Sequence, residues 1–295
     1  MKTVVTIGVC VRDCEASITE AIVSVLGQDF PRELMELIVV DGCSRDKTLS
    51  IIEESLSRNR VKSRVFHENE GLGTARQVIV DNANSDYIVW VDGDMSIPSN
   101  YVREQVEFME RNPQVGIAKG TPVYTGNNLV STLESIAFLL DRFRGLKYWI
   151  MQTGGGIYRV EAIRQARGFD RRIIGAMEDA DIAGRICSLG WIAAHSRPAF
   201  YHRPRQTWKA LWQEYSWWGY GTHFLRHKYG KEAAGLLFEL PPVAFMIGVK
   251  RSVYAYRLTH KVVSLLLPIQ FIFKKAAWCL GYVNGCVDGY GHALA

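Results

Sequence analysis

The 295-residue sequence lacks three features that would each assign it to a familiar class of protein. Its six cysteines form no C-x-x-C pair, and no histidine spacing completes a tetrahedral zinc site, so we do not expect a zinc module. An uninterrupted apolar run of about 20 residues, the length that a membrane-spanning helix needs, is also missing. The first residues enter a strand pattern without a signal peptide, and we therefore expect a cytoplasmic protein.

Acidic residues are scarce in the last third of the chain. From residue 200 onward there are 12 Lys and Arg but only 4 Asp and Glu, and this stretch holds five of the eight Trp and five of the seven His. Over the whole chain, 48% hydrophobic and 22% charged residues are ordinary for a folded protein, which argues against disorder. The composition predicts a domain over residues 1–200 and a basic, aromatic, helical region over residues 201–295.

Strand and helix patterns alternate through the first hundred residues. This alternation predicts an α/β fold with a mainly parallel sheet. The first helix opens on the capping box Ser17-Ile18-Thr19-Glu20. Strands are predicted at 3–11, 37–40, 61–66 and 86–91, and helices at 17–27, 46–57, 74–82, 99–111, 129–146 and from 178 to about 189.

Polar side chains follow the predicted strands. Arg12, Asp41, Asn69 and Asp92 fall at the carboxyl ends of four strands, where open α/β sheets bind their ligands. Capping or turn formation explains any one of them, but the four together predict one crevice. Asp92 and Asp94 lie one residue apart on an extended strand, so both carboxylates point the same way and can hold a divalent cation against phosphates.

A second acidic group opens the helix predicted from residue 178. The helix dipole favours acidic residues in a first turn, so capping is one interpretation of Glu178, Asp179 and Asp181. The other interpretation is a carboxylate that acts as a general base on an attacking hydroxyl.

In this order, the segments resemble the family 2 glycosyltransferases over about residues 1–200. The likeness rests on residues 39–48, on Asn69-Glu70-Gly71-Leu72-Gly73-Thr74-Ala75-Arg76, on Asp92-Gly93-Asp94, and on residues 178–185 followed by Gly190-Trp191. It implies the GT-A nucleotide-sugar fold and a nucleoside-diphosphate-sugar donor. It also implies a Mg²⁺ or Mn²⁺ cofactor and transfer with inversion at the anomeric carbon.

The resemblance also implies roles for single residues in the donor site. Asp41 would contact the nucleobase, Asp92 would lie near the ribose, and Asp94 would bind the metal on the diphosphate. Arg76 would sit beside the nucleotide, and Arg12, at the end of the first strand, joins the same predicted nucleotide-sugar site.

Catalysis is expected at the second acidic group. By the resemblance Asp179 is the base and Glu178 its supporting neighbour. A base is useful to an acceptor hydroxyl, whereas a phosphate acceptor is already ionised at neutral pH.

Two positions depart from the family pattern: Gly42 replaces an acidic residue, and Ser216 replaces the Arg of the Gln-x-x-Arg-Trp motif in processive synthases. A single-addition enzyme is therefore expected.

Two other functions remain open at this point. A sugar-phosphate nucleotidyltransferase would need a glycine-rich, basic loop near the N-terminus, and residues 9–14 offer none. A non-catalytic nucleotide-sugar-binding module would have no need of both Asp94 and Asp179, since two acidic groups facing one crevice repel each other.

The basic tail allows two interpretations. Residues 206–229 have helical spacing, with an aromatic stripe that is either core or an acceptor platform formed by His202, Trp217, Trp218 and Tyr220. Apolar segments at 236–249 and 262–273 are either a packed helical pair or interfacial helices on the cytoplasmic face of a membrane. Contact with a membrane surface would fit a lipid-linked or membrane-associated glycan acceptor, and a nucleic-acid partner is not expected. The second segment ends at Lys274-Lys275, and on the interfacial interpretation both lysines would lie at lipid headgroups.

Overall fold

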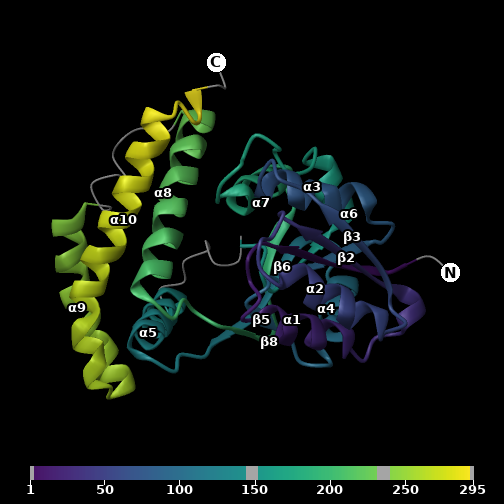
Figure 1. The fold of residues 1–295 in the computed structure, drawn as a ribbon, viewed down its shortest axis with the longest axis horizontal. Coiled ribbons are helices and arrows are strands. Elements are labelled where there is room, and N and C mark those ends of the chain that lie inside the picture. The colour runs from purple at the N-terminus through teal and green to yellow at the C-terminus, as the bar shows by residue number, and fades with distance from the viewer. Residues whose placement is uncertain (1–2, 144–151, 231–239, 293–295) are drawn as a thin grey trace. The chain divides into compact units, whose positions relative to one another are not determined.

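The computed structural model describes residues 3–143, 152–230 and 240–292. The chain forms two compact units, drawn in Figure 1. The first comprises Met1–Val123, Lys147–Ile174 and Glu178–His202, and the second Tyr124–Leu146, Gly175–Met177 and Arg203–Ala295. The second unit therefore includes a helix that precedes residue 200 in addition to the basic tail.

An eight-stranded sheet organises the first unit, in the order β3-β2-β1-β4-β7-β6-β8-β5. The first four strands are parallel: β1 (Val5–Val11), β2 (Met35–Asp41), β3 (Lys62–His67) and β4 (Tyr87–Trp90). β7 (Gly156–Arg159) is antiparallel to β4 and β6 (Val115–Tyr124), and β5 (Met95–Ser96) is antiparallel to β8 (Ile192–His202). The predicted α/β fold is confirmed, and the sequence missed strands β5 to β8.

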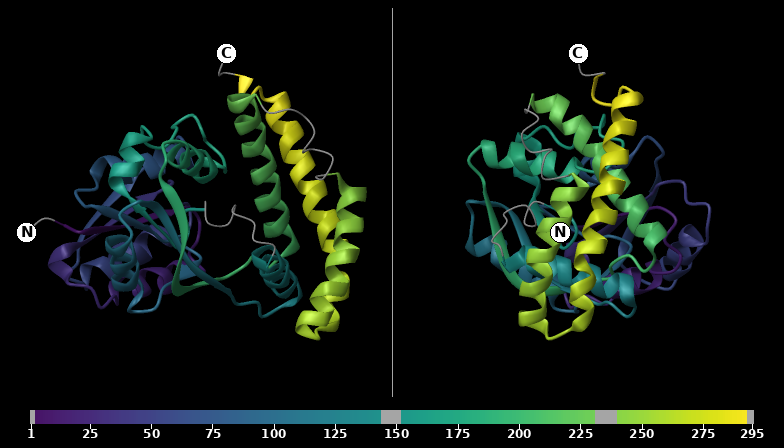
Figure 2. Two further views of the ribbon diagram at one scale, coloured as in Figure 1. Left: turned by 180° about the vertical axis from the view of Figure 1, so that it is seen from behind. Right: turned by 90° about the vertical axis from the view of Figure 1, so that its left-hand side faces the viewer.

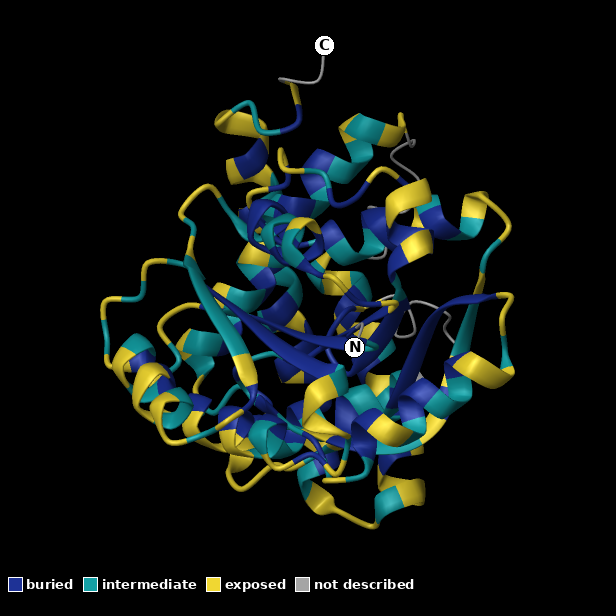
Figure 3. Ribbon diagram, turned by 90° about the vertical axis from the view of Figure 1, so that its right-hand side faces the viewer, coloured by how far each residue is buried: buried dark blue, intermediate teal, exposed yellow. Residues whose placement is uncertain are grey.

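Helices cover both faces of this sheet because strand residues alternate between two cores. Leu37 and Val39 of β2 face one core, and Ile38 and Val40 face the other. Strands β1, β2, β4 and β7 and most of β6 are buried, and dark blue strands are visible in Figure 3, whereas β3 and β8 are mostly half-buried or exposed. The first core is covered by α1 (Ile18–Leu26), α2 (Thr48–Ser57) and α4 (Tyr101–Arg111), and the second by α3 (Leu72–Asn82), α6 (Val160–Gln165) and α7 (Glu178–Ser188).

The predicted capping box does not form, although its helix begins where expected. Ser17 is the N-cap of α1, but its side chain makes no capping hydrogen bond. Its hydroxyl instead donates to the Cys14 carbonyl at 3.4 Å. Glu20 accepts a hydrogen bond from the Ser96 hydroxyl at 3.1 Å, and so joins α1 to β5.

The second unit is built from α5 and three long helices. α5 (Leu129–Phe143) begins where predicted, and its predicted end at 146 lies outside the described residues, as does the start of the apolar segment at 236–239. α8 (Trp208–Tyr229) and α10 (Leu267–Val287) lie side by side in Figure 2. Gly281 faces Ser216 and Gly285 faces His223, so these helices run in the same direction. α9 (Pro241–Thr259) returns through a 3₁₀ turn (Val262–Leu266) and packs on α10.

A buried ion pair links α5, α8 and α10. Glu134 accepts hydrogen bonds from Tyr215 at 2.8 Å, Gln270 at 3.0 Å and Lys274 at 2.9 Å. Lys274 is 4% exposed, so its predicted place at lipid headgroups is wrong, and α10 continues through it to Val287. The segment Val262–Val287 is long and apolar enough to cross a membrane by length and composition, but 44% of its most apolar stretch is buried.

The close approach of α8 and α10 depends on glycine. A Cβ on Gly281 would lie 1.8 Å from the Ser216 carbonyl oxygen, whereas a Cβ on Gly184 of α7 would meet nothing within 4 Å. We expect Gly281→Ala to lower the free energy of unfolding by about 1–3 kcal/mol through overpacking. Gly184→Ala, the control, should raise it by about 0.5–1 kcal/mol through helix propensity. Urea denaturation measures both, and equal effects would contradict the packing.

Candidate active site

A buried arginine, Arg76 of α3, is the charged centre of the first unit. Its side chain is 3% exposed, and Nη2 donates to Asp92 Oδ1 at 2.8 Å. Nε lies 3.6 Å from Glu178 Oε1, and the guanidinium lies over the Trp90 ring at 4.9 Å. A buried charge is costly unless it is paired. Arg76 therefore ties the end of β4 to the start of α7.

Two glycines let the start of α3 reach this position. Gly71 has φ +130°, and a Cβ there would lie 2.4 Å from Ile174 Cα. A Cβ on Gly73 would lie 2.4 Å from the Asp170 carbonyl oxygen. Larger residues would push α3 away from the 170–174 segment, and Arg76, three residues later, would move with it.

Glycines at positions 154–156 allow the backbone to approach Asp92 closely. A Cβ on Gly154 would lie 2.4 Å from Asp92 Oδ2. Gly155 has φ +67°, and its amide donates to the Trp90 carbonyl at 2.9 Å. Asp92 is thus held between the Arg76 guanidinium on one oxygen and a glycine backbone on the other.

Two adjacent carboxyl groups begin α7. Glu178 is 3% exposed and Asp179 is half-buried. Burial, and then the neighbouring Asp179 carboxylate, raises the pKa of Glu178, while Arg76 opposes the shift. Burial also raises the pKa of Asp179, against the Ala180 amide and the cations Arg76 and Lys119. Two adjacent buried carboxyl groups do not readily ionise together, because their negative charges repel each other. We call Arg76, Asp92, Glu178 and Asp179 the Arg76 cluster.

Asp181, in the same helical turn, has a structural place. Its carboxylate is fully buried and receives Arg185 Nη2 at 2.5 Å and Nε at 2.9 Å. Arg185 also donates to the Gly168 carbonyl at 2.7 Å. The pair therefore fixes α7 to the preceding turn, which agrees with the structural interpretation for this one acidic residue.

Asp94 lies beside His202 of β8. The register of β5 and β8 pairs Met95 with His202, which brings His202 Nε2 to 3.5 Å from Asp94 Oδ1. The two side chains are 19% and 20% exposed, so both remain open to solvent. A carboxylate and an imidazole are both common metal ligands. The pair therefore fits one side of a divalent cation.

Asp41 and Arg12 lie at the neighbouring strand ends. Asp41 is 1% exposed and accepts hydrogen bonds from the Ser44 hydroxyl at 2.6 Å and the Ser44 amide at 3.1 Å. His67 Nδ1 lies 3.6 Å from the same carboxylate. Arg12 is exposed, with its guanidinium 3.8 Å from Asp13. Within the described ranges, neither Asp41 nor Arg12 makes a direct hydrogen bond or ion pair with the Arg76 cluster.

The sequence analysis missed Lys119, a buried cation on β6. It is 2% exposed, and its Nζ lies 3.3 Å from Gln152 Oε1. Burial lowers its pKa to about 8, while the carboxylates of Asp179 and Asp92 oppose the shift. The available signal was a single lysine after the apolar run Val115-Gly116-Ile117-Ala118, but this stretch was not recognised as a strand.

Two models of known protein families match the chain. The family model described as "Glycosyl transferase family 2" matches residues 6–167, more than half of the chain. This chain belongs to glycosyl transferase family 2. A second model, "Glycosyl transferase family group 2", matches residues 87–284 and so extends into the helical unit.

Curated relatives and solved structures of the family resemble parts of the chain. The poly(ribitol-phosphate) beta-N-acetylglucosaminyltransferase TarS of Staphylococcus aureus is 32% identical over 99 residues, 33% of this chain and 17% of TarS. An uncharacterized glycosyltransferase of Haemophilus influenzae is 31% identical over 135 residues, 44% of this chain and 53% of that protein. The chain thus spans about half or less of these relatives.

A solved family structure shares the fold over nearly the whole chain. It is the mannosyltransferase PcManGT from Pyrobaculum calidifontis in complex with GDP-Man and Mn²⁺. Its TM-score is 0.68 at 17% identity, with 98% of this chain and 88% of that chain covered. The GT-A fold expected from the resemblance is therefore confirmed.

The raised pKa of Glu178 predicts a pH-dependent stability. Unfolded Glu ionises near pH 4.5, whereas folded Glu178 keeps its proton to higher pH. The contribution of Glu178 to the free energy of unfolding is fully present below about pH 4.5, and it is lost as the pH rises through the pKa of the folded state. From pH 5 to 8, the free energy of unfolding of the wild type should fall relative to that of Glu178→Gln, by up to about 1.4 kcal/mol per pH unit.

Urea denaturation at several pH values tests this slope. Glu161→Gln is the matched control, because Glu161 is an exposed carboxylate in the first turn of the neighbouring helix α6. The control should follow the wild type. Parallel curves for the wild type and Glu178→Gln would contradict the raised pKa.

Proposed function

We propose that the protein is an inverting, metal-dependent glycosyltransferase that moves a sugar from a nucleoside-diphosphate sugar to a hydroxyl of a lipid-linked or membrane-associated glycan. The observation that carries this proposal is the Arg76 cluster at the carboxyl ends of the parallel strands. Arg76 pairs with Asp92 and Glu178, and its positive charge also acts on the adjacent Asp179 carboxyl. Open α/β sheets bind ligands at that edge. Family membership and the GT-A fold support the same reaction class.

Asp179 is the proposed general base. Its carboxyl is half-buried with a raised pKa, which makes it a better proton acceptor than an ordinary aspartate near neutral pH. Arg76 and Lys119 oppose the shift and favour the ionised form of the carboxyl. Glu178, more deeply buried, keeps its proton longer and leaves the negative charge to Asp179. An acceptor hydroxyl gains from such a base, whereas a phosphate acceptor is already ionised.

The donor is proposed to bind along the ends of β1, β2 and β4. Asp92 is held by Arg76 and Gly154, so it presents a fixed carboxylate to a ribose hydroxyl. Asp41 is fixed by Ser44 and would receive a base N–H at this edge. Arg12 is exposed and free to move onto a phosphate. These residues would bind and orient the donor, and none of them would take part in making or breaking a bond.

Asp94 and His202 are the residues proposed to hold Mg²⁺ or Mn²⁺. Their donor atoms lie 3.5 Å apart and both side chains remain partly exposed. When bound there, a divalent ion would act as a Lewis acid on the diphosphate leaving group. One interpretation of the sequence placed His202 in an acceptor platform, and its position beside Asp94 favours the donor side instead.

The acceptor is proposed to receive a single sugar. Ser216 stands where processive synthases carry Arg, and its hydroxyl donates to the Ala277 carbonyl at 3.0 Å. This position lies in the contact between α8 and α10, where a long basic side chain would not fit. Of the aromatic residues expected to form a platform, Trp218 packs on Tyr215 and Tyr220 stacks on Tyr290, whereas Trp217 is 41% exposed.

A membrane surface is proposed to meet the outer sides of α9 and α10. An exposed apolar stripe with helical spacing runs along α10. A second stripe runs along α9, next to the exposed cations Lys250, Arg257 and Lys261. Apolar side chains with flanking cations are typical of helices at anionic headgroups. The stripes consist of Ile269, Ile272, Leu280, Val283 and Val287 on α10, and of Met246, Val249 and Val253 on α9.

Replacing the proposed base tests the reaction. Asp179→Asn should lower kcat by about 10²–10⁴-fold, because general-base catalysis contributes that much. Donor binding should change little, since the amide is isosteric. Sugar transfer and donor hydrolysis are measured with a panel of UDP- and GDP-sugars and Mn²⁺, and donor binding by thermal shift. Glu161→Gln is the control, and full turnover by Asp179→Asn would remove it from the role of base.

Liposome binding tests the proposed membrane contact. The full chain should sediment with vesicles that contain anionic lipid and less with neutral vesicles, and added salt should weaken the binding. The double variant Ile269→Ser and Val283→Ser removes two exposed apolar side chains and should reduce sedimentation, whereas Val23→Ser, exposed on α1, should not. Sedimentation that is independent of lipid charge and of the stripe would contradict this surface.

A further inference from the structure

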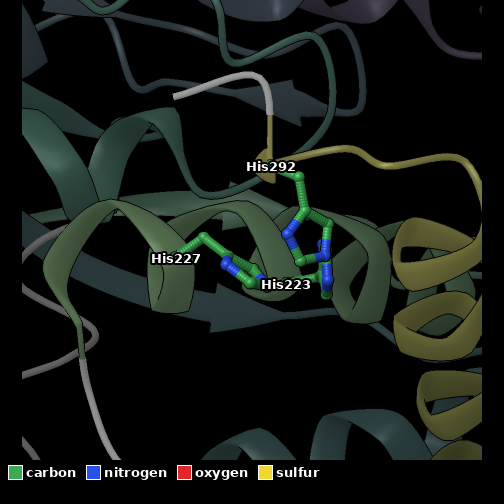
Figure 4. A group of neighbouring side chains, drawn as sticks. All are labelled: His223, His227 and His292. Atoms are coloured by element: carbon green, nitrogen blue, oxygen red, sulfur yellow. The ribbon is translucent and has the colours of Figure 1, made fainter. Parts of the chain in front are cut away.

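Three histidines of the second unit converge at the C-terminal end of α8. His223 and His227 lie one helical turn apart, and His292 follows α10 (Figure 4). One ring nitrogen from each lies within 4.8 Å of the other two. The ring centroids are 4.5 Å apart for His223 and His227, 3.9 Å for His227 and His292, and 5.4 Å for His223 and His292.

His223 places polar ring nitrogens in a buried position. Its side chain is fully buried, and neither ring nitrogen has a hydrogen-bond partner within the part of the chain that is described. The Tyr290 backbone lies near enough to favour the charged form slightly, but outside hydrogen-bond geometry. Buried imidazole nitrogens without partners are costly. A neutral imidazole has one lone pair, on the ring nitrogen that carries no proton, and a metal ion bound there would satisfy that nitrogen.

Two glycines near the histidines allow the backbone to come close to the histidine side chains. A Cβ on Gly285 of α10 would lie 3.3 Å from His223 Nδ1. Gly291 has φ +97°, and a Cβ there would lie 3.2 Å from His227 Cβ. Tyr290 stacks on Tyr220 of α8 at 4.5 Å, with the rings nearly parallel. The glycines and the stacked tyrosines hold the turn that carries His292 against α8.

We propose that His223, His227 and His292 bind a transition-metal ion, with Zn²⁺ the best match. Three imidazoles are a common protein ligand set for Zn²⁺ and leave one position for water. Histidines at i and i+4 on one helix face share a metal in known zinc sites. His227 and His292 are exposed, so an ion can enter from solvent. The spacing of the histidines along the chain did not indicate this group, because His292 is far away in sequence from the other two.

The protonation states of the histidines agree with this site. Burial first, and then the neighbouring imidazoles, lower the pKa of His223. Burial and His292 lower the pKa of His227. Metal binding needs neutral imidazole, so little proton release is required at neutral pH.

This site differs in chemistry from the pair Asp94 and His202. Three nitrogen ligands suit Zn²⁺, Ni²⁺ or Co²⁺, whereas Mg²⁺ prefers oxygen ligands. A bound ion would fasten the C-terminal turn to α8 and stabilise the helical unit. Its role is therefore structural and independent of sugar transfer.

Metal titration of the full chain, purified without a histidine tag, tests the proposal. Isothermal titration with Zn²⁺ and the visible spectrum with Co²⁺ report binding, and we expect one equivalent per chain with the bands of a low-coordinate cobalt site. His227→Ala and His292→Ala change exposed side chains that folding does not require. Each should weaken Zn²⁺ binding at least about 100-fold, since even outer-shell changes cost 10–100-fold.

Two further variants make the outcome decisive. His260→Asn is the matched control, because His260 is exposed and its φ of +54° is one that Asn tolerates. It should bind Zn²⁺ as the wild type does. The inference fails if Zn²⁺ does not bind, if binding survives both His227→Ala and His292→Ala, or if it is Asp94→Asn that removes it.

Discussion

The ion pair between Arg76 and Asp92 is the constraint on which the rest of the site depends. Arg76 is almost fully buried, so its charge must be matched inside the protein, and Asp92 and Glu178 provide the matching carboxylates. One comes from the end of β4 and the other from the start of α7, which are far apart in the sequence. A single guanidinium therefore sets the distance between the part of the sheet that would bind the donor and the helix that would supply the base. The guanidinium also lies over the buried Trp90 ring, 4.9 Å from its centroid.

The charges around Arg76 do not balance, and this bears on donor binding. Asp92, Glu178 and Asp179 face two cations, Arg76 and Lys119, and burial weakens the charge of Lys119 by lowering its pKa to about 8. Burial, and then repulsion from the Asp179 carboxylate, raises the pKa of Glu178, and a proton kept on Glu178 brings the group close to neutral. No spare positive charge then remains in this cluster, within the described residues, for a diphosphate. Under the proposed function, the charge of a diphosphate donor would be matched by cations outside this cluster, such as Arg12 or a metal ion held by Asp94 and His202.

The sequence predicts the parallel half of the sheet well and the antiparallel half poorly. Short apolar runs such as Leu37-Ile38-Val39-Val40 are buried on both faces and are readily recognised as strands. β6 and β8 contain Gly120, Pro122 and Pro198, which interrupt the pattern, so both strands were missed. Lys119 and the contact of His202 with Asp94 could not be predicted for the same reason, since both depend on those strands. Likewise, the burial of Lys274 within α10 depends on Glu134, 140 residues earlier in the chain, and no local pattern contains that information.

α10 is apolar on more than one side, so the helical unit exposes apolar surface to water. Its inner side packs through glycine and alanine against α8, where Gly281 and Gly285 allow backbone contact. Its outer side carries Ile269, Val283 and Val287, each more than half exposed. A helix that is apolar all round is ordinarily buried. Exposed apolar area is unfavourable by about 25 cal/mol per Å², so this surface is stabilised by whatever covers it. The nearby cations on α9 favour an anionic lipid surface over an apolar protein partner, because a protein core would have to desolvate them.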